Sequence, residues 1–195
     1  MELKQNASAC VILLHEIYGV NEHIKHYAQL LFKRGFDVYV PNMIQRNEPF
    51  TYEEADKAYE NFINNVGFIR AQAQIQKLIH QLSNKYEEIQ LIGFSVGATI
   101  AWLCSESAKV HKVVAFYGSR IRQYTNVQPK AKTILVFGNN EKSFNPIDLK
   151  ESLRAKENME VHIVEGAHGF ADPYSSNYNR SVTEHIIENI LFDLI

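Results

Sequence analysis

Short apolar runs and segments of helical period alternate along the whole chain. The runs are rich in β-branched residues, as strands usually are, and the first, ACVILLH, is almost continuously apolar. They span residues 9–15, 36–41, 88–94, 112–118, 132–138 and 160–166. Connections of helix length allow the strands that they join to lie parallel in one sheet. The pattern therefore predicts an α/β fold with a compact, mostly parallel, twisted sheet and helices on both faces.

Apolar residues at helical spacing mark the segments between these runs. The first helix is expected to end at Lys33 and Arg34, because Gly35 suits the left-handed position that follows many helices. Gly67 is expected to separate two further helices, and a helix poor in charge is expected at residues 96–104. The apolar stripes are Ile24, Tyr27, Ala28, Leu31 and Phe32; Ala55, Ala58, Tyr59 and Phe62; Ile75, Leu78, Ile79 and Leu82; Leu149, Leu153 and Ala155; and Val182, Ile186, Ile190 and Leu194.

The length and charge of the chain argue against several classes of function. A chain of 195 residues without a repeat, a low-complexity tract or a linker is expected to form one domain over residues 1–195. A formal net charge of -2 does not indicate the excess of basic residues that binding to nucleic acid or an anionic membrane requires. The apolar run at residues 10–14 is too short for a secretory leader or a membrane span, so we expect a cytoplasmic protein. Cys10 and Cys104 are expected to be reduced core residues.

Three residues with the chemistry of a nucleophile, a base and an acid follow three of the predicted strands. Ser95 follows the third strand within the motif GFSVG, Glu141 follows the fifth and His168 follows the sixth. Because ligands bind beyond the carboxyl ends of parallel strands, these residues are expected at one edge of the sheet. Serine, acid and histidine also occur in the chain order of an α/β-hydrolase triad. The sequence therefore predicts a catalytic triad.

The GFSVG motif has the small residues that such a nucleophile needs. A serine between a strand and a helix sits on a cramped turn, and Gly93 and Gly97 remove side chains that would collide there. The turn would leave the amide of Val96 at a helix N-terminus, free to bind an oxyanion. Ser95 needs a base to accept its proton, a role predicted for His168, and Glu141 would orient the imidazole.

Each of these residues also has a plainer interpretation. Taken alone, Ser95 could merely cap the following helix, Glu141 could be a solvated loop carboxylate, and His168 could be a surface histidine. The catalytic interpretation is favoured because all three coincide at strand ends in the right order. His23 and His26 lie one helical turn apart and could suggest a metal pair. A solvated helix face is the favoured interpretation, with no metal, because no third ligand is evident.

Four segments together resemble the dienelactone hydrolase family: HEIYGVNEHIK, GFSVGA, residues 138–141 and EGAHGFADPYSSNYN. The similarity extends from Val11 to the C-terminal helix. It implies a compact α/β-hydrolase fold that cleaves small esters and lactones through an acyl-enzyme without a cofactor. It also implies Ser95, Glu141 and His168 as the catalytic residues. The resemblance further implies the amides of Ile17 and Val96 as the oxyanion hole, and Glu16 matches a family glutamate that approaches the nucleophile.

The sequence departs from the family pattern at three positions, and the third of these bears on the expected substrate. Ser95 stands where the best-known members have cysteine, and Glu141 where they usually have aspartate. Asp172 lies near the position of an arginine that holds the substrate carboxylate, which argues against dienelactone itself. We expect Glu16, together with Tyr18 and Tyr117, to contribute to substrate binding, with Glu16 excluding acidic substrates; core packing is nearly as good an interpretation of Tyr117.

The expected partner is a small ester or lactone, rather than nucleic acid or a membrane, and the protein is expected to be a monomer or a small homo-oligomer. An alternative function is a small-molecule binding protein with little or no turnover. The sequence leaves open whether residues 41–51 form a lid.

Overall fold

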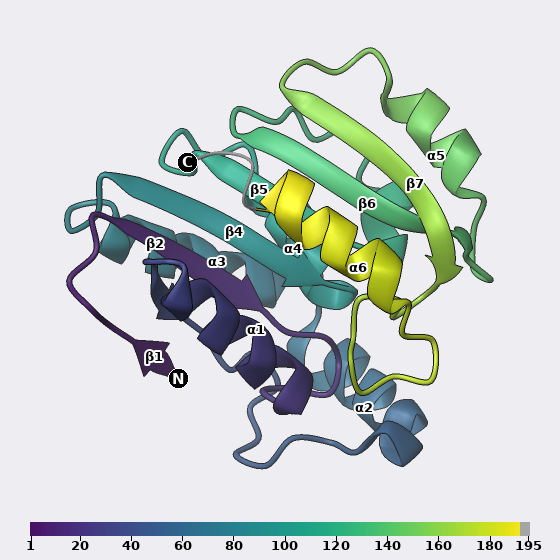
Figure 1. The fold of residues 1–195 in the computed structure, drawn as a ribbon, viewed down its shortest axis with the longest axis horizontal. Helices are drawn as coiled ribbons and strands as arrows, with labels where there is room; N and C mark the ends of the chain where they lie inside the picture. The colour runs from purple at the N-terminus through teal and green to yellow at the C-terminus, as the bar shows by residue number, and fades with distance from the viewer. Residues whose placement is uncertain (192–195) are drawn as a thin grey trace.

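Seven strands of the computed structural model, which describes residues 1–191, form one sheet (Figure 1). They are β1 (Glu2–Leu3), β2 (Ala9–Leu14), β3 (Asp37–Tyr39), β4 (Glu88–Phe94), β5 (Lys112–Phe116), β6 (Lys132–Asn140) and β7 (Met159–Ala167). The spatial order is β1-β3-β2-β4-β5-β6-β7, and every neighbouring pair is parallel except β1 with β3. The predicted α/β fold with a mostly parallel sheet is confirmed.

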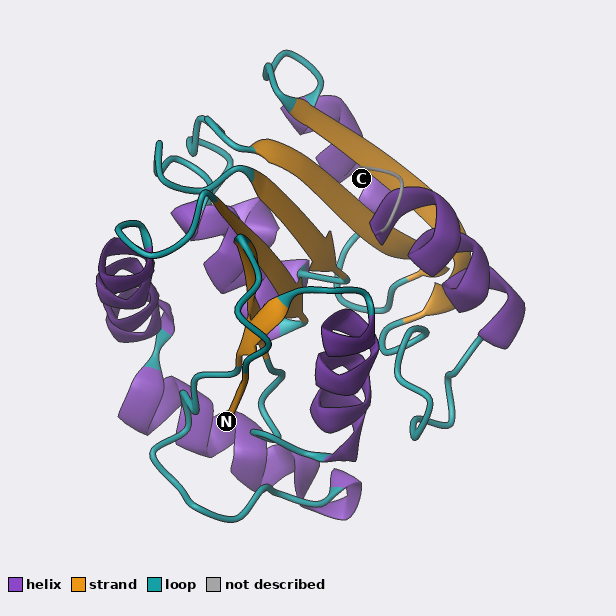
Figure 2. Cartoon of the chain, turned by 60° about the vertical axis from the view of Figure 1, so that its left-hand side comes forward, coloured by secondary structure: helices purple, strands orange, loops and turns teal. Residues whose placement is uncertain are grey.

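Helices cover both faces of the sheet (Figure 2). They are α1 (Glu22–Lys33), α2 (Ala55–Asn61), α3 (Phe68–Leu82), α4 (Val96–Cys104), α5 (Pro146–Leu153) and α6 (Arg180–Ile186). Side chains of β2 alternate between two cores, as those of any strand do: Ile12 packs with α3 and α4, and Val11 packs with α1 and α6. The nearly continuous apolar run of β2 thus reflects burial on both faces.

The ends of β6 and β7 differ from the prediction in a way that matters for the site. Both strands were expected to end at a glycine, Gly138 or Gly166, but they continue to Asn140 and Ala167. The two glycines lie so close together that a Cβ at Gly138 would come within 2.3 Å of the Gly166 carbonyl oxygen. The register of the pair is irregular between Gly138 and Asn140. Because the two strands lie so close together here, Glu141 and His168, which follow them, lie next to each other.

The other predicted strand bounds agree within two residues, and β4 has the predicted bounds. The edge strand β1 was missed because two residues carry no periodic signal. Pairing with β2 limits β3 to Asp37–Tyr39, and the amide of Val40 instead donates to the Met1 carbonyl oxygen.

The helix-ending glycines are where the sequence places them. Gly35 follows α1 and has a φ of +96. Gly67 has a φ of +69 and lies between a π-helical turn at residues 62–66 and α3. Ala155 lies beyond the end of α5. Val182 and Ile186 belong to α6, Ile190 belongs to the wide turn at residues 187–191, and Leu194 lies outside the described residues.

Burial explains the chemistry of both cysteines. Cys10 and Cys104 are buried, free thiols in the core, as predicted. Burial raises the pKa of each thiol to about 12, so neither is a reactive thiolate near neutral pH. Among residues 1–191, no helix has both the length and the apolar character needed to cross a membrane.

Candidate active site

Ser95 is the only residue between β4 and α4, and its backbone is strained. Its φ of 52 and ψ of -111 lie in a region that side-chain-bearing residues rarely adopt. The amide of Ser95 donates to the Phe116 carbonyl oxygen at 3.0 Å, which ties the turn to the end of β5. This sharp strand-to-helix turn holds the side chain of Ser95 above the edge of the sheet, the geometry of a nucleophile elbow.

The two glycines that flank Ser95 are required by close backbone contacts. A Cβ at Gly93 would lie 2.3 Å from the Gly97 carbonyl oxygen. A Cβ at Gly97 would lie 2.4 Å from the carbonyl oxygen of Leu14 and 2.6 Å from that of His15. Gly97 therefore lets α4 approach the end of β2, where the turn containing Ile17 begins. The predicted reason for both glycines is confirmed.

His168 follows β7 and lies between Ser95 and Glu141. Its Nε2 atom is 3.0 Å from the Oγ atom of Ser95, and its Nδ1 atom is 3.1 Å from the nearer carboxylate oxygen of Glu141. The side-chain amide of Asn177 donates to the His168 carbonyl oxygen at 2.8 Å, and the ring of Tyr117 packs 4.9 Å from the imidazole, centroid to centroid. The structure thus brings together the three residues that the sequence grouped at strand ends.

The charge around His168 favours its protonated form. Burial would lower the pKa of this imidazole, but the hydrogen bond and negative charge of Glu141, together with the charge of Glu16, outweigh it. The pKa of His168 is therefore raised above its ordinary value of 6.5. Only 1% of the Glu141 side chain is exposed, so solvent screens this carboxylate weakly. The arrangement suits a base that must hold a proton during a reaction.

A cavity of about 490 Å³ opens beside these side chains. Ile17 and Val96 line it together with Ser95 and His168. Val96 is the first residue of α4, where an amide has no acceptor within the helix, and the amide of Ile17 makes no hydrogen bond within residues 1–191. Two amides are therefore available near the hydroxyl of Ser95. The remaining walls come from Tyr59, Phe68, Thr99, Ser119, Arg120, Asn140, Glu141, Lys142, Ser143, Ala167 and Asn177.

Comparison with known proteins assigns this chain to one family. The profile of the Dienelactone hydrolase family matches residues 2–192. The chain belongs to the dienelactone hydrolase family. Among curated proteins, it is 41% identical to the uncharacterized protein YczH of Bacillus subtilis (strain 168) over 184 residues, which cover 92% of this chain and 90% of that protein.

Two further relatives carry functional names. Carboxymethylenebutenolidase from Pseudomonas putida is 26% identical over 184 residues, which cover 86% of this chain and 77% of that protein. A putative dienelactone hydrolase from Klebsiella pneumoniae has a crystal structure that superposes with a TM-score of 0.81 at 19% identity, covering 95% of this chain and 85% of that one. The structural likeness confirms the α/β-hydrolase fold that the family resemblance implied.

The family-implied residue Glu16 does not line the cavity. Its carboxylate is buried and lies 3.6 Å from the Nδ1 atom of His23. Burial would raise the pKa of Glu16, but His23, with help from His168 and Tyr117, holds it below the ordinary value. Glu16 therefore affects the site through its charge behind the cavity wall, and its contact with a substrate stays a prediction.

The two tyrosines expected as pocket walls also lie elsewhere. Tyr117 is fully buried in the core beneath His168, and Tyr18 packs edge-on against Tyr52 at 4.9 Å between ring centroids. Core packing is thus the correct interpretation of Tyr117. Neither belongs to the cavity wall, whose aromatic members are Tyr59 of α2 and Phe68 of α3.

Asp172 is turned away from the cavity, contrary to the expectation that an acidic group faces the substrate there. It is 1% exposed and accepts a hydrogen bond of 2.6 Å from the Tyr52 hydroxyl. The charged side chains that line the cavity wall include Arg120 and Lys142, which sequence analysis missed because neither belongs to a recognisable motif. Residues 41–51 do not contribute to the lining of this cavity.

His23 contradicts the expectation of a solvated helix face. The residue is fully buried, whereas His26, one turn further along α1, is exposed. The two histidines therefore point in different directions and form no pair. The sequence pattern failed here because the residues that surround His23 come from distant segments, Glu16 after β2 and Asp172 before α6.

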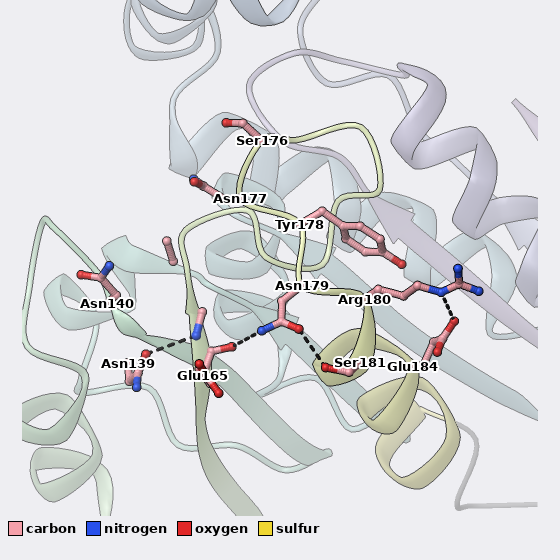
Figure 3. Close-up of a pocket in the computed structure, with 12 residues that line it drawn as sticks. Asn139, Asn140, Glu165, Ser176, Asn177, Tyr178, Asn179, Arg180, Ser181 and Glu184 are labelled. Carbon is pink, nitrogen blue, oxygen red and sulfur yellow. Dashed lines mark hydrogen bonds and ion pairs between the residues drawn. The ribbon is translucent and has the colours of Figure 1, made fainter.

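A second cavity of about 740 Å³ borders the first and shares Asn140, Ala167 and Asn177 with it (Figure 3). Its polar side chains are largely engaged within the protein. Asn139 accepts from the Gly166 amide at 3.2 Å, and the side-chain amide of Asn179 donates to the Glu165 carbonyl oxygen at 3.2 Å. The first contact joins the ends of β6 and β7, and the second ties the loop that follows His168 to β7.

Proposed function

We propose that this member of the dienelactone hydrolase family is a serine hydrolase that cleaves small carboxylic esters or lactones through an acyl-enzyme. One observation carries the proposal. The hydroxyl of Ser95, both ring nitrogens of His168 and the carboxylate of Glu141 form an unbroken chain of contacts at the wall of a cavity. A relative named carboxymethylenebutenolidase supports hydrolytic chemistry on this fold.

The contacts define how the nucleophile is activated. A carboxylate can only accept hydrogen bonds, so Glu141 selects the imidazole tautomer that carries its proton on Nδ1. The unprotonated Nε2 then accepts the hydroxyl proton of Ser95 while Oγ bonds to the carbonyl carbon of the ester. The imidazolium that forms lies between the negative charge of Glu141 and the developing oxyanion, and both stabilise it.

The oxyanion of the tetrahedral intermediate would be bound by the amides of Ile17 and Val96. Both residues line the cavity, and loss of one oxyanion donor costs roughly 3 to 4 kcal/mol in comparable enzymes. His168 then donates its new proton to the leaving alcohol, and the C–O bond breaks to give the acyl-enzyme. Water repeats the sequence with His168 as the base, which releases the acid and restores Ser95.

The size of the cavity supports a small substrate. A volume of about 490 Å³ lies in the lower part of the range typical for small-molecule sites. Tyr59 and Phe68 supply apolar wall opposite the nucleophile's polar surroundings, which suits an acyl or alcohol group of a few carbon atoms.

The direct test is hydrolysis of short nitrophenyl esters by the wild type, Ser95→Ala and a matched variant, Ser143→Ala. Both serines line the cavity, but only Ser95 contacts His168. We expect turnover by the wild type, a loss of about 10⁴-fold or more in Ser95→Ala, and at most a few-fold change in Ser143→Ala. A wild type that binds such esters but hydrolyses them only at the buffer rate would support the binding-protein alternative instead.

A further inference from the structure

Three buried side chains from distant segments converge behind the wall of the active site. Glu16 follows β2, His23 lies in α1, and Asp172 lies in the loop before α6. Their exposed fractions are 5%, 0% and 1%. One ligand-type atom of each, a nitrogen of His23 and an oxygen of each acid, lies within 4.8 Å of the other two. A carboxylate, a carboxylate and an imidazole are the donor set of many divalent-metal sites.

The distances within this cluster are too long for hydrogen bonds. The Nδ1 atom of His23 lies 3.6 Å from the nearest oxygen of Glu16 and 3.7 Å from that of Asp172. A direct hydrogen bond would bring these atoms to about 2.7 to 3.2 Å. By contrast, two ligands of a tetrahedral Zn²⁺ ion lie about 3.4 Å apart when each is about 2.1 Å from the metal. The separations are therefore closer to those of ligands around one ion.

The hydrogen bonds of the cluster are also incomplete. Neither ring nitrogen of His23 makes a hydrogen bond within residues 1–191, although the side chain is fully buried. The hydroxyl of Tyr117, which faces Glu16, makes no hydrogen bond of good geometry within residues 1–191 either. Buried polar atoms are nearly always paired, so the unpaired Nδ1 atom of His23, which faces both carboxylates, indicates a bound species between them. The Tyr117 hydroxyl offers a further oxygen to that species or to a water bound with it.

Charge indicates that this species is a cation. Glu16 and Asp172 bring two acidic groups into a region with little solvent, and buried charges are normally paired or bound to a metal. Within residues 1–191, neither Glu16 nor Asp172 forms a salt bridge with lysine or arginine. A divalent cation would balance the charge of the two carboxylates when it binds, and His23 would bind it through an unprotonated nitrogen.

Contacts outside the cluster hold the donors in place. The Tyr52 hydroxyl and the Tyr174 amide donate to the two carboxylate oxygens of Asp172, at 2.6 and 2.8 Å. The ring of His23 packs edge-on against Phe94 at 4.5 Å and Tyr27 at 5.2 Å, centroid to centroid. Such outer contacts are what fix ligand orientation in metal sites.

We propose that Glu16, His23 and Asp172 bind one Zn²⁺ ion, which joins the turn bearing Ile17 and the loop after His168 to α1. Mixed nitrogen and oxygen donors favour Zn²⁺ over Mg²⁺ or Ca²⁺, which prefer oxygen alone. The ion has a structural role here, because the donors lie behind the cavity wall and none of them lines it. This inference is independent of the proposed esterase reaction.

The test is metal content and Zn²⁺-dependent stability of the full chain, purified without an affinity tag that binds metals. We expect one Zn²⁺ per chain. After removal of the ion with a chelator, Zn²⁺ at a free concentration about 100-fold above its Kd should raise Tm by about 5 to 10 °C, whereas Mg²⁺ should not. A wild type that retains no metal and whose Tm does not respond to Zn²⁺ would overturn the proposal.

Two matched variants locate the ion. His23→Gln should lose the Zn²⁺-dependent rise in Tm, and His26→Gln, altered one turn away on the exposed face of α1, should keep it. His168→Gln should also keep it, because the catalytic histidine is not a donor. Binding that survives in His23→Gln but disappears in His168→Gln would place the ion at the triad and contradict the proposal. If His23→Gln does not fold, Asp172→Asn serves in its place with the same expected loss.

Discussion

Glu141 lies directly behind His168, with both carboxylate oxygens within 3.2 Å of the imidazole Nδ1 atom. The other ring nitrogen of His168, Nε2, contacts the hydroxyl of Ser95. One imidazole thus connects a carboxylate that is almost fully shielded from solvent with a hydroxyl on a strained turn. The proposed chemistry follows from this connection, and so does its dependence on pH.

The pH profile should report the raised pKa of His168. The neutral imidazole is the base, so kcat/KM should rise with pH as His168 loses its proton, with an apparent pKa above 6.5. Glu141→Gln removes the larger of the two charges that raise this pKa, so that only Glu16 still opposes the lowering effect of burial. The rising limb should therefore move to lower pH, while the maximal rate falls by about 10²-fold or more because the tautomer is no longer held.

A matched control for this profile is Glu165→Gln, which removes an exposed carboxylate from the same strand-end region. Its rising limb should stay where the wild-type limb lies. A limb that is unmoved in Glu141→Gln would mean that Glu141 does not set the pKa of the base.

The cavity should favour anionic over neutral esters, opposite to the expectation from sequence. Arg120 and Lys142 line it, and the acidic residue of the lining, Glu141, is paired with His168. Glu16 and Asp172 lie behind the wall. The measurement is the ratio of kcat/KM for a carboxylate-bearing ester to kcat/KM for a neutral ester of equal length, at low salt. Lys142→Gln should lower this ratio by about 2- to 5-fold, which is the effect expected of one exposed charge.

Lys85→Gln is a suitable control, because Lys85 is exposed at the opposite end of β4 from Ser95. It should leave the ratio unchanged. The account of the cavity charge is wrong if Lys142→Gln and Lys85→Gln have the same ratio as the wild type.

Gly97→Ala should destabilise the fold and impair the site together. The added Cβ would collide with the carbonyl oxygens of Leu14 and His15, neither of which can move without displacing β2. We expect a loss of about 3 kcal/mol in the free energy of unfolding. Gly35→Ala has space around its Cβ and only a positive φ, so it should cost about 1 kcal/mol. Denaturant unfolding measures both, and equal losses would contradict the assigned role of Gly97.

Local sequence patterns sufficed for most of the fold. Buried strands such as β4 and helices such as α4 are recognisable because a run of apolar residues or a flanking glycine is visible within ten residues. The positions of Ser95 and His168 followed from the same patterns, since parallel strands end at one edge. The two-residue β1 carries no such pattern and was missed.

Side-chain direction could not be obtained in this way. His23 and His26 are equally polar in sequence, but one turn of helix decides that His23 enters the core, where Glu16 and Asp172 meet it. Tyr117 likewise follows a strand, as a pocket residue would, but its φ of 43 belongs to a turn that packs the ring beneath His168. The directions of these two side chains depend on contacts between distant segments, which a local sequence pattern does not reveal.

The central claim is that Ser95 becomes the covalent nucleophile when His168 accepts its proton. The most direct measurement is treatment of the wild type and His168→Ala with a fluorophosphonate probe, followed by mass spectrometry of the intact chain and its peptides. The account predicts one probe per wild-type chain, attached to Ser95, and labelling slowed by at least about 10³-fold in His168→Ala. An unlabelled Ser95 in an active wild type, or equally rapid labelling in both proteins, would contradict it.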